Sequence, residues 1–237
     1  MAEPLRPRAF ISYRHAEHEN VLDAARLNAD HRLWVEQFCR ELTQHGVDAI
    51  YDTQLREFFR PHTARDPQLV PFLAEVSTIS CLVCHAFIPI LTPSYIGRLG
   101  FADYQRQDSA TQSFVFEEWQ TGCFYANAGV MQFVPIVRAG DHELMAALPQ
   151  LGVGPENGFD MRDPAHFQAQ VGFIAERIMR AWDGGPALIT LSLEEWVSRY
   201  IDWCRGNYPG CADQKVDDWQ VDLLRPRLFI EAALGRK

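Results

Sequence analysis

The sequence of 237 residues has no apolar run long enough to cross a membrane and no apolar core of signal-peptide length at its N-terminus. It is also short of positive charge, because 31 acidic residues outnumber 22 lysines and arginines and give a net charge of −9. An acidic surface attracts neither the phosphates of nucleic acids nor an anionic membrane surface. We therefore expect a cytoplasmic protein that binds neither nucleic acid nor membrane.

The common catalytic signatures are missing as well. The sequence has no GxGxxG after its first predicted strand, no GxxxxGK[ST], no GxSxG and no HExxH. Cys81 and Cys84 form a CxxC, but no second ligand pair stands at the spacing that a zinc site needs. We predict reduced, buried thiols at these two positions and no metal site.

What the sequence does contain is an alternation of apolar runs with amphipathic segments. We predict parallel strands near residues 8–13, 47–51, 87–92 and 132–137, with a short fifth near 159–162, and helices between them. This order predicts an α/β fold, a flavodoxin-like, doubly wound parallel sheet of about five strands. The strand residues expected in the core are Phe10, Ile11, Ile50, Ile90, Val134 and Ile136.

The first helix is predicted after a polar connection that ends near residue 30. In the segment HRLWVEQFCRELTQHG, Leu33, Trp34, Phe38 and Leu42 are expected near one helical face, and Gly46 is expected to stop the helix. A later helix, over residues 164–182, is expected to begin at a proline and to bury an apolar side.

A shorter segment follows the breaker Asp183-Gly184-Gly185-Pro186. We therefore predict a main domain over residues 1–182 and a helical C-terminal extension over residues 183–237. Leu193, Trp196 and Tyr200 have the spacing of one helical side. We expect that side to pack against the main domain or against a second copy of the chain.

Polar, charged and aromatic residues that could bind a ligand or take part in catalysis follow the predicted strands. In open parallel sheets, ligands bind outside the carboxyl ends of the strands. The groups expected at that edge are Ser12, Tyr13 and Arg14 after the first strand, Asp52 with Phe58, Phe59 and Arg60 after the second, and Tyr95 after the third. The helix that carries Glu117 and Glu118 is expected to begin near the same edge.

Five segments, taken in order, resemble the Toll/interleukin-receptor (TIR) family. They are FISYR (10–14), WVEQFCRELTQHGVDAIYD (34–52), IPILTPSYI (88–96), FVFEEW (114–119) and QFVPIVRAG (132–140). In that order, the first three segments resemble the family's first strand, its first helix with the second strand, and its third strand with the exit that follows. The fourth segment resembles the helix with a Trp–Cys–x–x–Glu pattern, and the fifth resembles the fourth strand. The spacing is closest to the bacterial TIR and SEFIR-like branch.

Some members of the family cleave NAD+ at the nicotinamide–ribose bond, often in bacterial antiphage defence or cell-death signalling. The resemblance implies Glu118 as the catalytic glutamate, with Glu117 as the neighbouring alternative. Such a carboxylate stabilises the oxocarbenium-like ribose, and an arginine and aromatic rings can hold the pyrophosphate and the nicotinamide. The implied substrate-binding residues are Ser12, Tyr13, Arg14, Asp52, Phe58, Phe59, Arg60 and Tyr95. NAD+ is then a substrate, and no cofactor is implied.

The sequence also fits other functions. Phe114 and Val115 replace the tryptophan and cysteine of the family's helix, and Ala16-Glu17 stand where an aspartate is usual. Other family members are non-catalytic scaffolds, whose partners are other TIR domains bound by self-association. A nucleoside deoxyribosyltransferase-like hydrolase shares the fold and the glutamate chemistry. A phospho-acceptor receiver domain would need acidic residues after the first strand, and Ser12, Tyr13 and Arg14 do not supply them.

Overall fold

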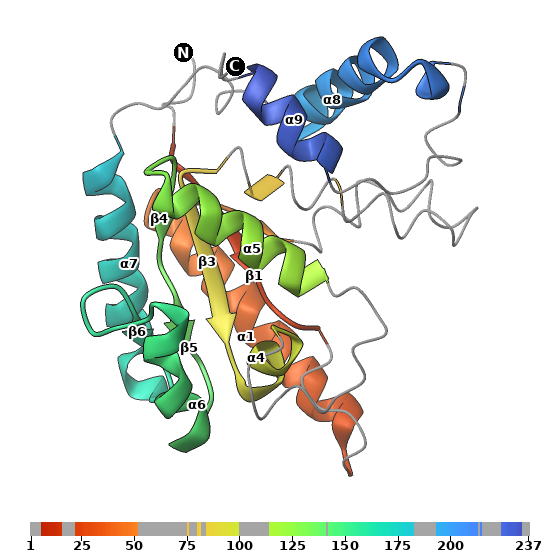
Figure 1. The fold of residues 1–237 in the computed structure, drawn as a ribbon. Helices are drawn as coiled ribbons and strands as arrows, with labels where there is room; N and C mark the ends of the chain where they lie inside the picture. Colours follow the sequence, from red (N-terminus) through yellow and green to blue (C-terminus); the bar gives the residue numbers. More distant parts are fainter. Residues whose placement is uncertain are drawn as a thin grey trace.

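The computed structural model describes residues 6–15, 22–51, 75, 80–81, 84–99, 114–140, 142–182, 193–212, 214 and 224–233 (Figure 1). Its strands are β1 (Arg8–Ser12), β2 (Asp48–Tyr51), β3 (Ala86–Leu91), β4 (Gln132–Phe133), β5 (Ile136–Val137) and β6 (Phe159–Asp160). Its α-helices are α1 (Ala24–Gln44), α4 (Pro93–Arg98), α5 (Phe114–Asn127), α6 (His142–Ala147), α7 (Phe167–Ala181), α8 (Leu193–Asn207) and α9 (Leu224–Ala233). Short 3-10 helices span Leu148–Leu151, Pro164–His166 and Pro209–Cys211.

The strands form one parallel sheet in the order β2-β1-β3-β5-β6, with β4 also paired to β3. The predicted strands and the short fifth strand are confirmed, and the protein is an α/β protein built on a parallel sheet. The strand residues predicted in the core are all buried, namely Phe10, Ile11, Ile50, Ile90, Val134 and Ile136. Parallel strands need such apolar runs because helices cover both of their faces.

The predicted strand over 132–137 is divided into β4 and β5. Both halves pair with β3 in one register, in which Ile90 pairs with Ile136 and Pro89 therefore lies opposite Pro135. Proline has no backbone N–H, so a ladder hydrogen bond is lost at this level. The interruption is thus local, and the two short strands act as one element of the sheet.

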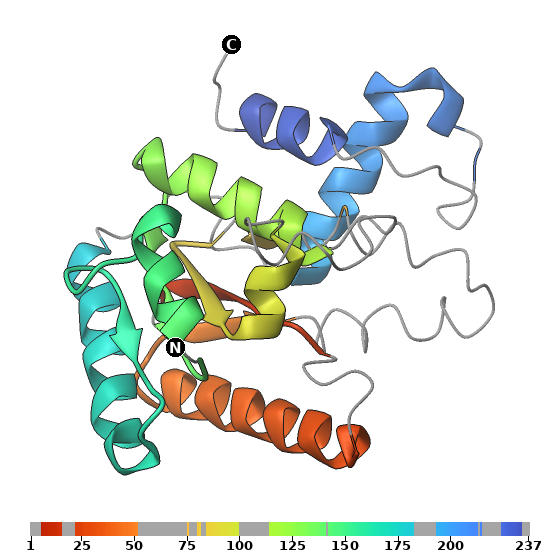
Figure 2. The same ribbon diagram turned by 60° about the horizontal axis from the view of Figure 1, so that its bottom comes forward.

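Two hydrophobic clusters lie on the two sides of the sheet. Ala9 and Ile11 of β1 pack with residues of α1 and α7, whereas Phe10 packs with Trp119 and Tyr125 of α5. Successive side chains of a strand point to opposite faces, which explains this division. Figure 2 shows α1 (orange) on one side of the sheet and α5 (light green), with α8 and α9 (blue), on the other. The fold is therefore three-layered.

The first helix differs from its prediction in two ways. It begins at Ala24 rather than near residue 31, because the preceding segment AARL consists of strong helix formers. Leu33 is 61% exposed, although Phe38 and Leu42 are buried. Leu33 lies about 140° from Phe38 around the helix axis and so falls outside the buried side. The predicted stop is confirmed, since Gly46 adopts a left-handed φ of 90° just after the helix.

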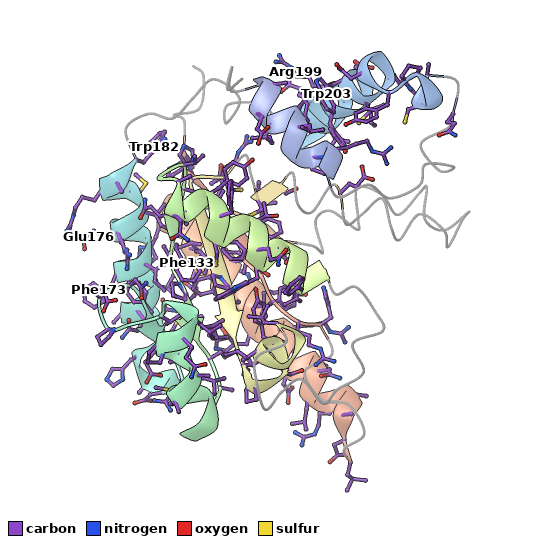
Figure 3. All side chains as sticks on the ribbon, in the orientation of Figure 1. Phe133, Phe173, Glu176, Trp182, Arg199 and Trp203 are labelled. Carbon is purple, nitrogen blue, oxygen red and sulfur yellow. The ribbon has the colours of Figure 1, made fainter. Side chains whose placement is uncertain are left out.

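The helix α7 has the predicted amphipathic arrangement. Phe167, Val171, Ile174 and Ile178 are buried against the sheet. Phe173 and Glu176 point away from it (Figure 3). Among the described residues, no helix is long and apolar enough to cross a membrane.

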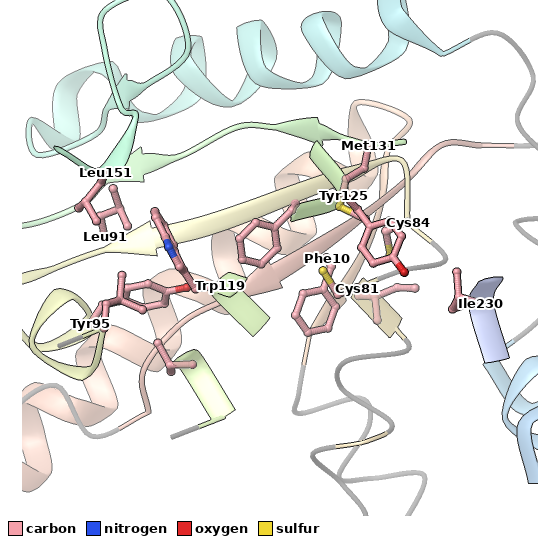
Figure 4. Packing of buried hydrophobic residues seen from close by; sticks show 14 of the residues in the cluster. Phe10, Cys81, Cys84, Leu91, Tyr95, Trp119, Tyr125, Met131, Leu151 and Ile230 are labelled. Carbon is pink, nitrogen blue, oxygen red and sulfur yellow. The ribbon is translucent and has the colours of Figure 1, made fainter. Parts of the chain in front are cut away.

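The C-terminal helices α8 and α9 pack against each other and against the α5 side of the main body. Tyr200 of α8 is completely buried, as predicted, whereas the side chains of Leu193 and Trp196 lie outside the described residues. Ile230 of α9 belongs to the same hydrophobic cluster as Cys81 and Tyr125 (Figure 4). The division of the chain into a main domain over residues 1–182 and a C-terminal extension over residues 183–237 stays a prediction.

A buried carboxylate joins these helices to the main body. The side chain of Glu75, which lies between β2 and β3 in the sequence, is fully buried. Tyr200 donates a hydrogen bond to its Oε2 at 2.6 Å, and Arg225 of α9 donates one to its Oε1 at 2.8 Å. Burial and the Glu75 charge raise the pKa of Tyr200, so its hydroxyl stays protonated and able to donate. One carboxylate therefore binds both C-terminal helices.

We predict that Arg225→Met destabilises the protein by about 3–5 kcal/mol, because it removes a buried positive charge that is hydrogen-bonded to the Glu75 carboxylate. Chemical unfolding of the purified protein measures the change. Arg199→Met, which alters an exposed arginine of α8, is the matched control and should change stability by less than about 0.5 kcal/mol. Equal stability of Arg225→Met and wild type would contradict this account of the contact.

Candidate functional site

Three predicted site residues meet at the carboxyl ends of β1 and β3. Ser12 is the last residue of β1, Tyr95 lies in α4 directly after β3, and Glu118 lies in the first half of α5. Ser12 shares a strand face with Phe10, so its side chain is on the α5 side of the sheet. The parallel topology thus brings together residues that are about a hundred positions apart in the sequence.

The three side chains form a continuous hydrogen-bonded group. The Ser12 hydroxyl donates to Oε2 of Glu118 at 2.6 Å, and its oxygen lies 2.8 Å from the hydroxyl oxygen of Tyr95. The exposed fractions are 1% for Ser12, 0% for Tyr95 and 7% for Glu118. Burial raises the pKa of Tyr95 well above its usual value, the bond with Ser12 offsets part of this rise, and the Glu118 charge adds to it. Tyr95 is therefore a protonated phenol.

Local structure holds each member of this group in place. The backbone N–H of Tyr95 donates to Oγ1 of Thr92, which caps the start of α4. A Cβ at Gly122 would collide with the ring of Phe87, so the glycine lets α5 lie close to β3. Glu118 stands one turn earlier on the same helix, and the close approach places its carboxylate within reach of Ser12.

Trp119 is a neighbour whose role the sequence analysis did not identify. It is buried, and its ring meets that of Tyr95 edge to face at a centroid distance of 6.2 Å (Figure 4). It also contacts Phe87 and Phe133 of the sheet. Val115, Trp119 and Gly122 follow the i, i+4, i+7 spacing of a buried helix side, which is the signal that could have located it.

Of the other predicted residues, Arg14 lies next to this group and Tyr13 lies on the opposite face of the sheet. Arg14 is buried, and its Nη1 donates to the backbone oxygen of Ser94 at 3.3 Å and also contacts Oγ of Ser94. It therefore lies at the start of α4, beside Tyr95. Tyr13 packs on the opposite face of the sheet, with ring centroids 4.5 Å from His15 and 5.8 Å from His31. The structure does not bring Tyr13 together with Glu118.

The remaining candidates are not placed. Asp52, Phe58, Phe59 and Arg60 lie outside the described residues. The backbone of Glu117 belongs to α5, but its side chain also lies outside the described part of the chain.

A separate open hollow of about 480 Å³ lies at the carboxyl end of β6, lined by Asp160, Arg162, Asp163 and His166. Its side chains contact one another in pairs. Arg162 donates to both carboxylate oxygens of Asp160, at 2.9 and 2.6 Å, and so lowers the pKa of that carboxyl group. His166 lies 3.1 Å from a carboxylate oxygen of Asp163. In the sheet order β6 is the third strand from β1, so this hollow is distinct from the Ser12–Glu118 group.

No disulfide joins the six cysteines, all of which lie in the described part of the chain. The predicted burial of Cys81 and Cys84 is confirmed, and the Cys84 thiol donates to the backbone oxygen of Ser80 at 2.9 Å. Within the described ranges, no group of three or more His, Cys, Asp or Glu side chains is arranged to hold a metal ion. Ser12, Tyr95 and Glu118 are therefore the polar cluster at the carboxyl edge on which a functional proposal can be built.

Comparisons of the chain with protein-family models, with curated proteins and with solved structures give no match.

We predict that Cys123, the least buried of the six thiols, reacts slowly with iodoacetamide in the native protein. Burial raises its pKa to about 12, so little reactive thiolate is present at pH 8. Peptide mass spectrometry should show labelling at least ~100-fold slower than in the urea-unfolded chain, with the rate still rising above pH 10. Rapid labelling of native Cys123 at pH 8 would contradict the raised pKa of this partly buried thiol.

Proposed function

We propose that this chain is a TIR domain of the bacterial TIR and SEFIR-like branch that cleaves NAD+ at the nicotinamide–ribose bond. The five family-like segments support this proposal by their order along the chain. The sheet order supports it too, because with β4 and β5 counted as one strand it is the 2-1-3-4-5 order of flavodoxin-like folds. The proposed setting is antiphage defence or cell-death signalling, with self-association through other copies of the domain.

The observation that carries the proposal is the position of Glu118. A carboxylate buried at the carboxyl edge of a parallel sheet lies where such folds bind their ligands. Its bond to Ser12 fixes one oxygen and therefore the direction of the group. This arrangement is more specific than an exposed glutamate on a helix surface, which has no fixed geometry.

The chemistry needs only a few groups. Nicotinamide leaves as a neutral molecule, so its departure requires no general acid. The ribose gains oxocarbenium character as the bond breaks, and a preorganised carboxylate beside the ribose hydroxyls stabilises that positive charge. In the proposal, Glu118 is this carboxylate and NAD+ is the substrate. Arg14, at the start of α4, is the proposed contact for the pyrophosphate.

The residues after β2 complete the proposed site. Phe58 and Phe59 are proposed to flank the nicotinamide ring, with Asp52 and Arg60 beside them. These assignments rest on the family resemblance alone.

A second function has its own support. The burial of Ser12, Tyr95 and Glu118 is also what a structural polar network would require, because such a network ties β1, α4 and α5 together. In that case the domain is a non-catalytic scaffold that binds other TIR domains.

We predict that Glu118→Gln lowers the rate of nicotinamide release from NAD+ on the order of 10²–10³-fold, because the amide keeps the shape of the side chain but removes the stabilising charge. Glu117→Gln is the matched control on the same helix and should have a much smaller effect. Free nicotinamide is measured by chromatography with the protein concentrated or crowded, so that an assembly requirement is met.

The outcomes separate the alternatives. If the two glutamine variants exchange effects, the catalytic residue is Glu117. If both variants match an active wild type, neither glutamate is catalytic. If wild type releases no nicotinamide under any assembling condition, the scaffold function is the better account.

A further inference from the structure

Ser12 and Tyr95 were expected to bind substrate, but both side chains are almost completely buried. A hydroxyl that is removed from the surface and already bonded to another side chain has little capacity to contact a ligand. We infer that Ser12 and Tyr95 are positioning residues, which hold the Glu118 carboxylate in its productive orientation through two consecutive hydrogen bonds. This inference rests on the proposed function for its kinetic consequence, but not for its structural one.

The donors and acceptors of this group fit only one arrangement when Glu118 is ionised. A carboxylate can only accept, so the single proton of the Ser12 hydroxyl points to Oε2 of Glu118. The Ser12 oxygen then accepts from Tyr95, which lies 2.8 Å away and remains protonated. The order is therefore Tyr95 to Ser12 to Glu118, and each bond polarises the next.

Tyr95 is itself held on two sides. Its backbone N–H bonds to Thr92, and its ring packs against Trp119. Ser12 is fixed as the last residue of β1, whose neighbours in the sheet are β2 and β3. The carboxylate oxygen that bonds to Ser12 is thus held in position by the sheet rather than by a loop. Such support is what a preorganised charge needs in order to stabilise a transition state.

Positioning and substrate binding differ in kinetics. A residue that binds substrate equally in the ground state and in the transition state raises KM when it is removed and leaves kcat unchanged. A residue that holds the catalytic carboxylate acts only on the chemical step, so its loss lowers kcat and leaves KM nearly unchanged. The structure therefore predicts that loss of the Ser12 or Tyr95 hydroxyl lowers kcat. The sequence analysis had instead placed both residues in contact with substrate, which would predict a change in KM.

The kinetic test uses Ser12→Ala and Tyr95→Phe in the full chain, with nicotinamide release measured over a range of NAD+ concentrations. Ser12→Ala removes a hydrogen bond to a charged group and should lower kcat on the order of ten- to a hundred-fold. Tyr95→Phe removes a bond between neutral groups and should lower kcat by about two- to ten-fold. KM should change less than about two-fold in both variants if they act as positioning residues.

Tyr125→Phe is the matched control. Tyr125 is also buried, and it stands seven residues beyond Glu118 on the same helix, about 10 Å along its axis. Removing its hydroxyl should leave kcat and KM unchanged.

A second measurement, chemical labelling of carboxyl groups, reports on the accessibility of Glu118 and does not depend on enzymatic activity. A water-soluble carbodiimide with an amine nucleophile labels accessible carboxyl groups, and tandem mass spectrometry identifies the labelled residue. In wild type, Glu118 should label more slowly than the exposed Glu195. In Ser12→Ala, labelling of Glu118 should rise several-fold, while labelling of the buried Glu75 stays unchanged and shows that the fold is intact.

The outcomes are distinct. A rise in KM with unchanged kcat would overturn the inference and make Ser12 a substrate-binding residue. Unchanged labelling of Glu118 in both variants would also overturn it. If wild type releases no nicotinamide, the proposed function fails, yet faster labelling of Glu118 in the variants still supports the positioning role. If Ser12→Ala does not fold, both measurements are made on Tyr95→Phe, which leaves the hydrogen bond between Ser12 and Glu118 in place.

Discussion

A carboxylate that is removed from water must receive hydrogen bonds, and this requirement organises two regions of the protein. Glu118 receives its bond from Ser12, which joins α5 to β1 and, through Tyr95, to α4. Glu75 receives its bonds from Tyr200 and Arg225, which join α8 and α9 to the main body. In both places one buried charge links segments that are distant in the sequence. The polar contacts thus specify how the apolar layers are aligned.

The two buried carboxylates, Glu75 and Glu118, differ in their hydrogen-bond partners and in their position relative to the sheet edge. Glu75 is paired with an arginine, so its charge is neutralised by its own structure. Glu118 instead accepts a hydrogen bond from the Ser12 hydroxyl and lies at the sheet edge where ligands of such folds bind. A preorganised carboxylate at this edge lies where its negative charge can act on a cationic transition state. This difference is the physical reason for proposing catalysis at Glu118 and a structural role for Glu75.

The sequence predicted the elements better than their contacts. Apolar runs such as the one around Ile90 identify parallel strands reliably, because both faces of those strands are buried. The exposure of Leu33 was missed, since an apolar residue one position out of phase looks the same in the sequence as one in the core. The pairing of Glu75 with Arg225, 150 residues away, leaves no local pattern at all. For the same reason, the sequence placed Ser12 at the correct edge but could not show that it bonds to Glu118.

The central claim is that Glu118 lies beside the scissile bond of NAD+. The most direct measurement is a structure of the Glu118→Gln variant with NAD+ bound, since this variant is expected to bind the substrate and to cleave it only slowly. The account predicts the nicotinamide-bearing ribose in contact with residue 118 and the pyrophosphate near Arg14. NAD+ bound away from this edge, for example in the hollow beside Asp160 and Arg162, would contradict the account.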